Sequence, residues 1–237
     1  MRDRAIAIVP ARAGSKGLPG KNRRYLQDKH LLAYPIEAAK QSKYVDDVFV
    51  STENHVLATL AEHYGAKVIC RPEELATDEA TSASVILHAL QWFNKFYKYF
   101  VYLEPTSPLT EASDIDTAFE MLLKNRKKAD AIVGVSQLVS HHPYFNVRLE
   151  NGLVKPHMTE DFKAMRRQDV ETLYFLDGSL YISSIKAFKE HESFYHNRTM
   201  GYVTPKWKSF EVDDITDFVC IEAILKAKER GSGITLV

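Results

Sequence analysis

The chain has 237 residues, enough to bury the hydrophobic core of one α/β domain with an added segment. Its 31 basic and 31 acidic residues cancel, so no overall charge favours nucleic acid or a membrane surface as a partner. No apolar run approaches 18 residues and no signal-peptide pattern follows Met1, so we expect a soluble cytoplasmic protein.

The first expected element is a strand over residues 5–9, which leads into a loop over residues 10–22. This loop contains three glycines and three cations, namely Gly14, Gly17, Gly20, Arg12, Lys16 and Lys21. Glycines let backbone N–H groups approach phosphate oxygens, and the cations neutralise phosphate charge. The spacing fits neither G-x-x-x-x-G-K-[ST] nor G-x-G-x-x-G, so the loop predicts a nucleoside triphosphate site of another kind.

Strand and helix patterns then alternate up to residue 135. We expect helices over 30–42 (with Pro35 in its first turn), 82–96 and 113–125 (capped by Ser113), and strands over 47–51, 67–70, 99–103 and 129–135. Thr52 or Asn54 can cap a further helix that ends before Gly65. The alternation predicts an α/β fold, a mostly parallel sheet of at least five strands with helices on both faces.

Ligands of such sheets bind at the carboxyl ends of the strands. The loops over 10–22, 71–82 and 104–110 all begin there, so we expect them to form one site. After residue 140 two strand-like runs flank Asn151-Gly152, a dipeptide favoured in tight hairpins. A hairpin arm rarely buries its apolar face alone. We therefore expect one domain over 1–237 with an excursion at about 140–200 that contacts another subunit.

Residues 8–22, Ile-Val-Pro-Ala-Arg-Ala-Gly-Ser-Lys-Gly-Leu-Pro-Gly-Lys-Asn, resemble the signature of the sialic-acid-type cytidylyltransferases, which make CMP-activated nonulosonic sugars. The resemblance implies a Rossmann-like nucleotidyltransferase fold, CTP as co-substrate and a homodimer formed through the excursion. It assigns the nucleotide to Ala11, Arg12, Ala13, Gly14, Ser15, Lys21 and Asn22. Arg12 and Lys21 would hold the triphosphate and act in catalysis.

A second part of the resemblance covers residues 71–82, which match the family loop that holds cytosine. It implies contacts from Arg71, Ala80 and Ser82. Loop carbonyls, a hydroxyl and a guanidinium supply the acceptors and donors that pyrimidine recognition needs. Ser82 is equally suited to cap the following helix as an additional role. For Arg71 the alternative is a plain surface charge.

The sugar side of the site is implied by three further blocks. Residues 103–109 resemble the family's sugar loop, with Glu104 in place of Gln and Thr110 in place of Arg. Residues 166–169 and 175–182 resemble its Arg-Gln and Asn-Gly-Ala-Ile-Tyr blocks, with Asp177 in place of Asn. The implied sugar-binding residues are Glu104, Thr106, Ser107, Arg167, Gln168, Asp177 and Tyr181.

Within these blocks an arginine would grip the sugar carboxylate bidentately, with Arg167 as the candidate and Arg166 as its rival. Phe194 and Tyr195 match an aromatic pair that, in the family, reaches the sugar across the dimer interface. Packing in the core explains such aromatic residues equally well.

Glu211 and Asp213 resemble the family's Asp-x-Asp metal motif. In a strand, side chains at i and i+2 share one face, so both carboxylates can reach one Mg²⁺ together with phosphate oxygens. Asp214 or Asp217 would cap the following helix, although all four acids can also be read as a solvated helix start. Cys70 and Cys220 lack metal-site spacing and lie in apolar stretches, which predicts core thiols.

Together these features predict CMP transfer from CTP to the anomeric hydroxyl of an α-keto sugar acid, with Mg²⁺ as cofactor and release of pyrophosphate. A KDO-type synthetase is an alternative, but it normally has an aromatic residue where Ala13 stands. A molybdopterin guanylyltransferase and a non-catalytic nucleotide-binding regulator are the others. The sequence does not identify the sugar.

Overall fold

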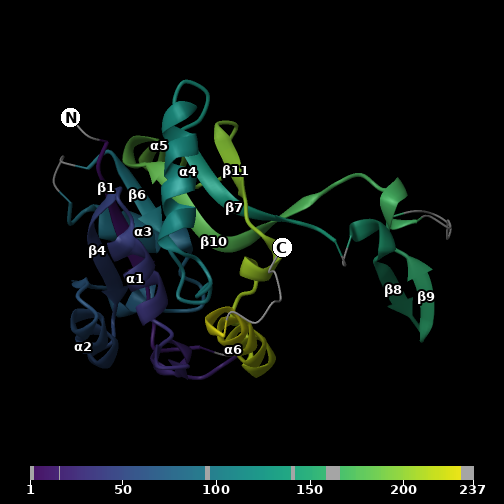
Figure 1. The fold of residues 1–237 in the computed structure, drawn as a ribbon, viewed down its shortest axis with the longest axis horizontal. Helices are drawn as coiled ribbons and strands as arrows, with labels where there is room; N and C mark the ends of the chain where they lie inside the picture. The colour runs from purple at the N-terminus through teal and green to yellow at the C-terminus, as the bar shows by residue number, and fades with distance from the viewer. Residues whose placement is uncertain (1–2, 16, 94–96, 140–141, 159–165, 231–237) are drawn as a thin grey trace.

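A computed structural model describes residues 3–15, 17–93, 97–139, 142–158 and 166–230. Its centre is a seven-stranded sheet of order β11-β7-β10-β6-β1-β4-β5 (Figure 1). The strands are β1 (Ala5–Pro10), β4 (Val45–Thr52), β5 (Lys67–Cys70), β6 (Tyr99–Tyr102), β7 (Ala131–Gln137), β10 (Tyr174–Ser184) and β11 (Thr199–Val203). Strand β10 is antiparallel to both of its neighbours, and the other pairs are parallel. The predicted mostly parallel α/β sheet is confirmed.

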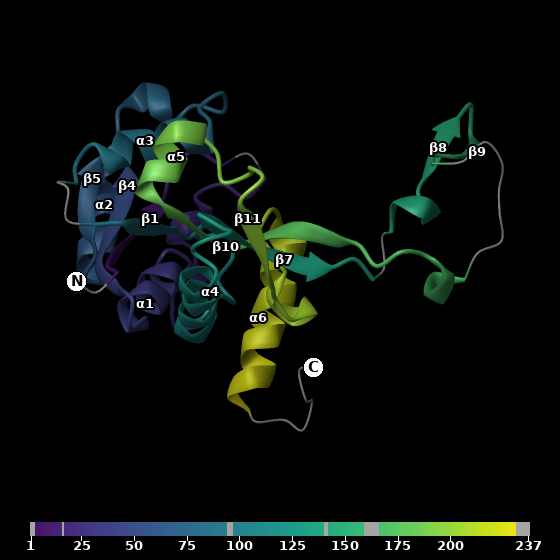
Figure 2. The same ribbon diagram turned by 90° about the horizontal axis from the view of Figure 1, so that it is seen from above.

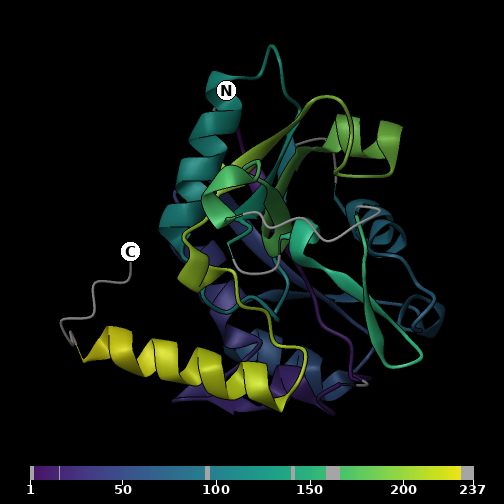
Figure 3. The ribbon, with the colours of Figure 1, turned by 90° about the vertical axis from the view of Figure 1, so that its right-hand side faces the viewer.

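Helices cover both faces of this sheet (Figure 2). Helices α1 (Ala33–Gln41), α2 (His55–His63) and α4 (Ala112–Lys124) share one core cluster, whereas α3 (Ser82–Leu90) and α5 (Ile185–His191) share another. Strand β1 is apolar throughout because it contributes to both: Ala5, Ala7 and Val9 pack on one side, and Ile6 and Ile8 on the other. Helix α6 (Ile215–Glu229), yellow in Figure 3, lies at the lower end of the body.

The ends of several helices differ from the sequence predictions. The first helix begins at Ala33 rather than residue 30, because His30 belongs to β3 (Lys29–His30), which pairs with β2 (Tyr25–Leu26). Helix α4 is capped by Glu111, not Ser113, in a capping box with Asp114. The predicted cap of α2 by Asn54 is confirmed by its hydrogen bonds to two backbone N–H groups.

Short 3-10 helices connect these elements in the described ranges. They are η1 (Lys21–Arg23), η2 (Glu73–Leu75), η3 (Pro143–Phe145), η4 (Arg167–Asp169) and η5 (Lys206–Lys208). None of the described helices is both long and apolar enough to cross a bilayer.

Between β7 and β10 the chain leaves the body as an arm, which we define as residues 138–173 (Figure 1). It carries the hairpin of β8 (Val147–Glu150) and β9 (Leu153–Pro156), and Asn151 and Gly152 both have positive φ. The hairpin predicted from this dipeptide is therefore confirmed. Its apolar side chains are exposed, with Leu149 at 74% and Leu153 at 65%.

The prediction of core thiols is wrong, since Cys70 and Cys220 are both exposed. Cys70 is the last residue of the edge strand β5, and the preceding residue, Ile69, is the buried one. On α6 the adjacent Ile221 faces the core instead of Cys220.

Candidate active site

A cavity of about 350 Å³ opens at the carboxyl ends of β1, β5 and β6. Because parallel strands end at the same edge, loops far apart in sequence meet here. The predicted site residues that line it are Arg12, Gly14, Ser15, Lys21, Asn22, Arg71, Ala80, Ser82, Glu104, Thr106, Glu211 and Asp213. The three loops expected to form one site therefore line one cavity.

Lys21 lies where the glycine-rich loop turns back toward the sheet. The preceding Gly20 adopts φ 65°, in the left-handed region that favours glycine. Lys21 Nζ donates to the Val212 carbonyl at 2.8 Å and lies 3.9 Å from Asp213 Oδ1. Burial lowers the pKa of Lys21, although the nearby carboxylates act in the opposite sense. A cation at this depth is well placed to meet a phosphate.

The start of the same loop is fixed by neighbouring segments. Ala11 is fully buried, and the Ala13 N–H donates to Glu53 Oε1 at 2.7 Å, so these two residues support the loop rather than line the cavity. Arg12 donates to Asp78 Oδ1 at 2.8 Å, which joins the first loop to the second. Asn22 Nδ2 donates to the Arg12 carbonyl at 3.0 Å. Lys16 lies outside the described residues.

The second loop places a buried guanidinium beside the cavity. The Arg71 side chain is 3% exposed and donates to Glu53 Oε2 at 2.9 Å, while its Nε has no hydrogen-bond partner among the described residues. The reading of Arg71 as a plain surface charge is therefore wrong. Thr81 accepts from the Ser84 N–H and caps α3, so Ser82 is not the cap.

Two residues of this region were missed by the sequence analysis. Tyr102 is buried and lines the cavity. Glu53 joins Ala13 to Arg71. The one sequence feature that could have identified Tyr102 and Glu53 is their position, because each lies at or just after the end of a strand that leads into the site.

Three acids gather opposite the basic loop. Burial raises the pKa of Glu104, which Lys21 partly offsets. The pKa of Glu211 rises to about 7 because the carboxyl is buried and lies near Glu104 and Asp213. The single Ser107 hydroxyl proton can be donated to the Gly178 carbonyl at 3.0 Å or to Glu211 Oε1 at 3.3 Å. Because these carboxylates repel one another, a bound cation would be stabilised among them.

The segment that carries Glu211 and Asp213 is not a strand, contrary to the sequence prediction. Its Val212 N–H donates to the Thr106 carbonyl at 2.8 Å, and the Val212 side chain is buried in the core. Glu211 and Asp213 nevertheless both line the cavity. Asp214 caps α6 in a capping box with Asp217, as predicted for one of these acids.

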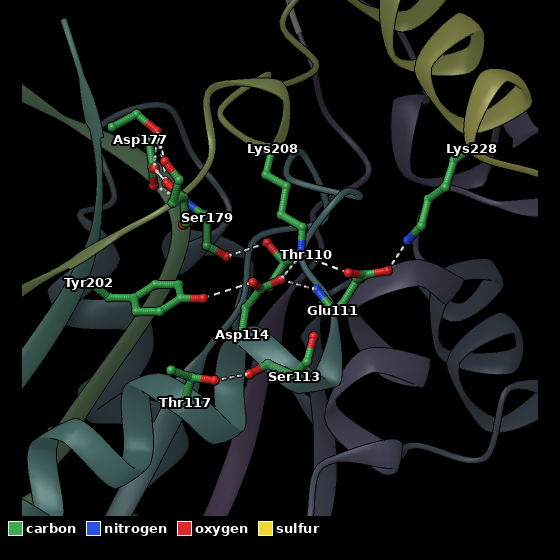
Figure 4. A network of polar contacts seen from close by, with 12 residues as sticks. Thr110, Glu111, Ser113, Asp114, Thr117, Asp177, Ser179, Tyr202, Lys208 and Lys228 are labelled. Carbon is green, nitrogen blue, oxygen red and sulfur yellow. Dashed lines mark hydrogen bonds and ion pairs between the residues drawn. The ribbon is translucent and has the colours of Figure 1, made fainter. Parts of the chain in front are cut away.

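The same segment is anchored to α4 by a network whose centre, Lys208 and Asp114, is buried (Figure 4). Lys208, 6% exposed, donates to Glu111 Oε2 at 2.7 Å and also contacts Asp114. Tyr202 Oη donates to Asp114 Oδ1 at 2.9 Å, and Lys228 of α6 pairs with Glu111. These contacts fix the position from which residues 209–214 enter the site.

Asp177 is not among the residues that line the cavity. It is 1% exposed and accepts from Ser136 Oγ at 2.9 Å, from the Ser179 N–H at 3.0 Å and from Thr204 Oγ1 (Figure 4). All these donors come from the chain itself, so this carboxylate supports the stretch of β10 between Leu176 and Tyr181, where the pairing with β7 shifts register, rather than presenting itself to a ligand.

The remaining predicted sugar residues lie outside the cavity as the described residues define it. Phe194 is 6% exposed and packs on Phe100 and Phe188, as the core interpretation requires. Tyr181 packs beside Phe194, whereas Tyr195 is exposed. Arg167 and Gln168 belong to η4 on the arm.

The residues present fit a magnesium ion. Glu211 and Asp213 offer hard oxygen ligands beside a cavity lined by cations, and the Asp213 side chain is 83% exposed. Across the described residues no group of three or more His, Cys, Asp or Glu side chains is arranged for a metal. Two carboxylates complemented by phosphate oxygens are the arrangement that Mg²⁺ prefers.

Residues 6–229 match the family model described as cytidylyltransferase. The chain is 36% identical over 231 residues to the N-acylneuraminate cytidylyltransferase of Escherichia coli O18:K1:H7, covering 97% of this chain and 54% of that protein. It is 33% identical over 234 residues to the CMP-N,N'-diacetyllegionaminic acid synthase of Legionella pneumophila, covering 96% and 98%. The chain thus spans about half the length of the Escherichia coli relative and nearly all of the Legionella one.

A solved structure of CMP:2-keto-3-deoxy-manno-octonic acid synthetase, complexed with CTP, has a similar fold. The TM-score is 0.70 at 13% identity, and the match covers 95% of this chain and 99% of that one. At this identity the likeness concerns the fold alone.

Proposed function

Because the chain belongs to the cytidylyltransferase family, we propose that residues 1–237 act as one domain that transfers CMP from CTP to the anomeric hydroxyl of a nonulosonic acid. Pyrophosphate is the other product. The observation that carries the proposal is the cavity itself, where the basic loop around Lys21 faces Glu211 and Asp213. A triphosphate between them meets cations on one side and a metal-binding pair of acids on the other.

In this proposal the triphosphate lies along the first loop. Arg12 and Lys21 neutralise its charge, and Gly14 and Ser15 line its path. Asn22 ties the loop together through its bond to the Arg12 carbonyl. Hydrogen-bond donors held in fixed positions stabilise the charge that develops on the phosphoryl oxygens in the transition state. They account for most of the rate acceleration in such a transfer, because they need not rearrange during the reaction.

Cytosine occupies the other end of the cavity, where Arg71, Ala80 and Ser82 form the wall with Tyr102. The buried guanidinium donates to ring acceptors, and loop carbonyls accept from the amino group. Glu211 and Asp213 would hold Mg²⁺, which when bound neutralises phosphate charge beside the attacking hydroxyl.

The sugar would be held between Glu104, Thr106 and residues supplied by a second copy of the chain. Val147, Leu149 and Val154 are exposed on one face of the hairpin, where Leu149 pairs with Val154, and a second subunit would cover this apolar face. Arg167 on the arm is the proposed clamp for the sugar carboxylate. We therefore propose a homodimer whose arms complete the sugar sites.

The relatives named above favour sialic or legionaminic acids over KDO as the substrate class. A pyrophosphate-release screen tests this, using CTP, Mg²⁺ and separate N-acetylneuraminic, legionaminic, pseudaminic, KDN and KDO acids. We expect release with at least one nine-carbon acid and a weaker response to KDO. Binding of CTP without release in every arm would refute the proposal and favour the non-catalytic regulator.

A further inference from the structure

Glu53 joins two loops that the proposed function assigns to different parts of CTP. It directly follows β4, the strand between β1 and β5 in the sheet. Its Oε1 accepts from the Ala13 N–H at 2.7 Å, and its Oε2 accepts from the Arg71 guanidinium at 2.9 Å. One carboxylate therefore holds the backbone of the first loop and the cation of the second.

The backbone on either side of Glu53 is fixed, so the carboxylate has little freedom to move. Asn54 caps α2 through its side chain, and the Asn54 N–H donates to Thr52 Oγ1 at 3.1 Å. The Thr52 carbonyl accepts from the Arg71 N–H at 2.9 Å, which sets β4 and the second loop side by side. The position of Glu53 is thus set by the sheet rather than by the loops it joins.

The contact with Arg71 is buried as well as close. The side chains of Arg71 and Glu53 are 3% and 14% exposed. Burial raises the pKa of Glu53, but the hydrogen bonds from Ala13 and Arg71 outweigh this and keep the pKa below its ordinary value. Glu53 is therefore charged at neutral pH, and it neutralises Arg71 at the cavity wall.

The neutralisation of Arg71 by Glu53 affects which part of a nucleotide Arg71 can bind. An unpaired guanidinium beside the cavity would attract the triphosphate, the most negative part of the ligand. Paired with Glu53, Arg71 becomes a source of directed N–H donors, and its Nε has no partner among the described residues. Such donors suit the neutral acceptors of a pyrimidine ring.

We infer that Glu53 is a positioning residue that holds the phosphate loop and the base loop in register and directs Arg71 toward the base. The inference rests on the proposed binding of CTP in this cavity. It assigns part of the nucleotide selectivity to a side chain that does not line the cavity in the described residues.

The test is Glu53→Gln, assayed by calorimetric titration with CTP and with UTP in the presence of Mg²⁺. Glutamine offers one acceptor oxygen and one donor group, so it cannot accept from both Ala13 and Arg71. We expect the Kd for CTP to rise at least tenfold, and the preference for CTP over UTP to fall at least threefold. Glu62→Gln, the same change at an exposed position of α2, is the matched control and should leave both values unchanged.

A Kd and a CTP preference like those of the unmodified chain would overturn the inference. Equal weakening of CTP and UTP would overturn the part that concerns Arg71. Thermal unfolding checks the fold of each variant. If Glu53→Gln does not fold, Glu53→Asp keeps the charge but is too short to reach both donors, and unchanged selectivity in that variant would also overturn the inference.

The titration separates this inference from the proposed function. If the unmodified chain binds CTP but releases no pyrophosphate with any sugar acid, the proposed reaction fails while the role of Glu53 is still decided by the two Kd values. If the unmodified chain binds neither nucleotide, both proposals fail.

Discussion

Replacing Lys208 with methionine would keep most of the length of the side chain and remove the ammonium group that contacts Glu111 and Asp114. Asp114 is 5% exposed, and it would retain the hydroxyl of Tyr202 and the Glu111 N–H as donors. Removing one partner of a buried ion pair costs about 3–5 kcal/mol, and these remaining donors favour the lower end, about 3 kcal/mol. For a chain of this size, that loss lowers Tm by about 6–12 °C.

Urea and thermal unfolding of Lys208→Met measure this loss directly. Lys206→Met is the matched control, because Lys206 belongs to the same 3-10 helix and is exposed. We expect the control to stay within about 0.5 kcal/mol of the unmodified chain. A loss below about 1 kcal/mol for Lys208→Met would refute the view that this network fixes the segment leading to Glu211.

Four further outcomes follow from the site. Lys21→Ala should lower kcat/KM for CTP by about 10²–10³, as expected for loss of one transition-state donor; near-normal kcat/KM would reject the role of Lys21. Asp213→Asn should abolish Mg²⁺-dependent turnover and Glu211→Gln should reduce it less, and full activity of Asp213→Asn in a Mg²⁺ titration would exclude metal binding there. Glu104→Gln should change the ranking of kcat/KM across the sugar panel, whereas Asp177→Asn should lower Tm and leave the ranking unchanged; the reverse pattern would contradict the structure. Glu211 has its pKa raised to about 7, so without metal the free energy of unfolding should fall as pH rises from about 4.5 to 7. Glu211→Gln should flatten that decline in urea titrations at successive pH values, and an equally steep decline would assign the effect to other groups.

The parts of the fold that the sequence predicted are those governed by local pattern. Residues 5–9 are apolar because they are buried on both faces of the sheet, and that pattern is visible without the structure. The loop over 10–22 is recognisable for a similar reason, because its glycines and cations lie close together in the sequence. The rule that ligands bind at strand carboxyl ends then placed the other loops beside it.

What escaped prediction depends on contacts between distant segments. Glu53 looks like an ordinary acid before a helix cap until β1, β4 and β5 set Ala13 and Arg71 on either side of it. Asp177 was expected to face the sugar, yet Ser136 and Thr204 bring donors to it from elsewhere in the chain. The hairpin predicted from Asn151-Gly152 is confirmed because a tight turn is encoded in two adjacent residues.

The order of the strands also has a consequence for how the chain reaches its native state. Strand β10 lies between β6 and β7, and both of these precede it in the chain. Until residues 174–184 emerge from the ribosome, β6 has one unpaired edge and β7 has two, since β11 also follows later in the chain. The intervening arm, residues 138–173, carries exposed apolar side chains of its own. Unpaired edges and apolar surface are what make incomplete chains aggregate. Because β10 pairs between β6 and β7, we expect the sheet to be completed only after the last third of the chain has been made. Productive folding, and the need for chaperones, should therefore depend on this late pairing.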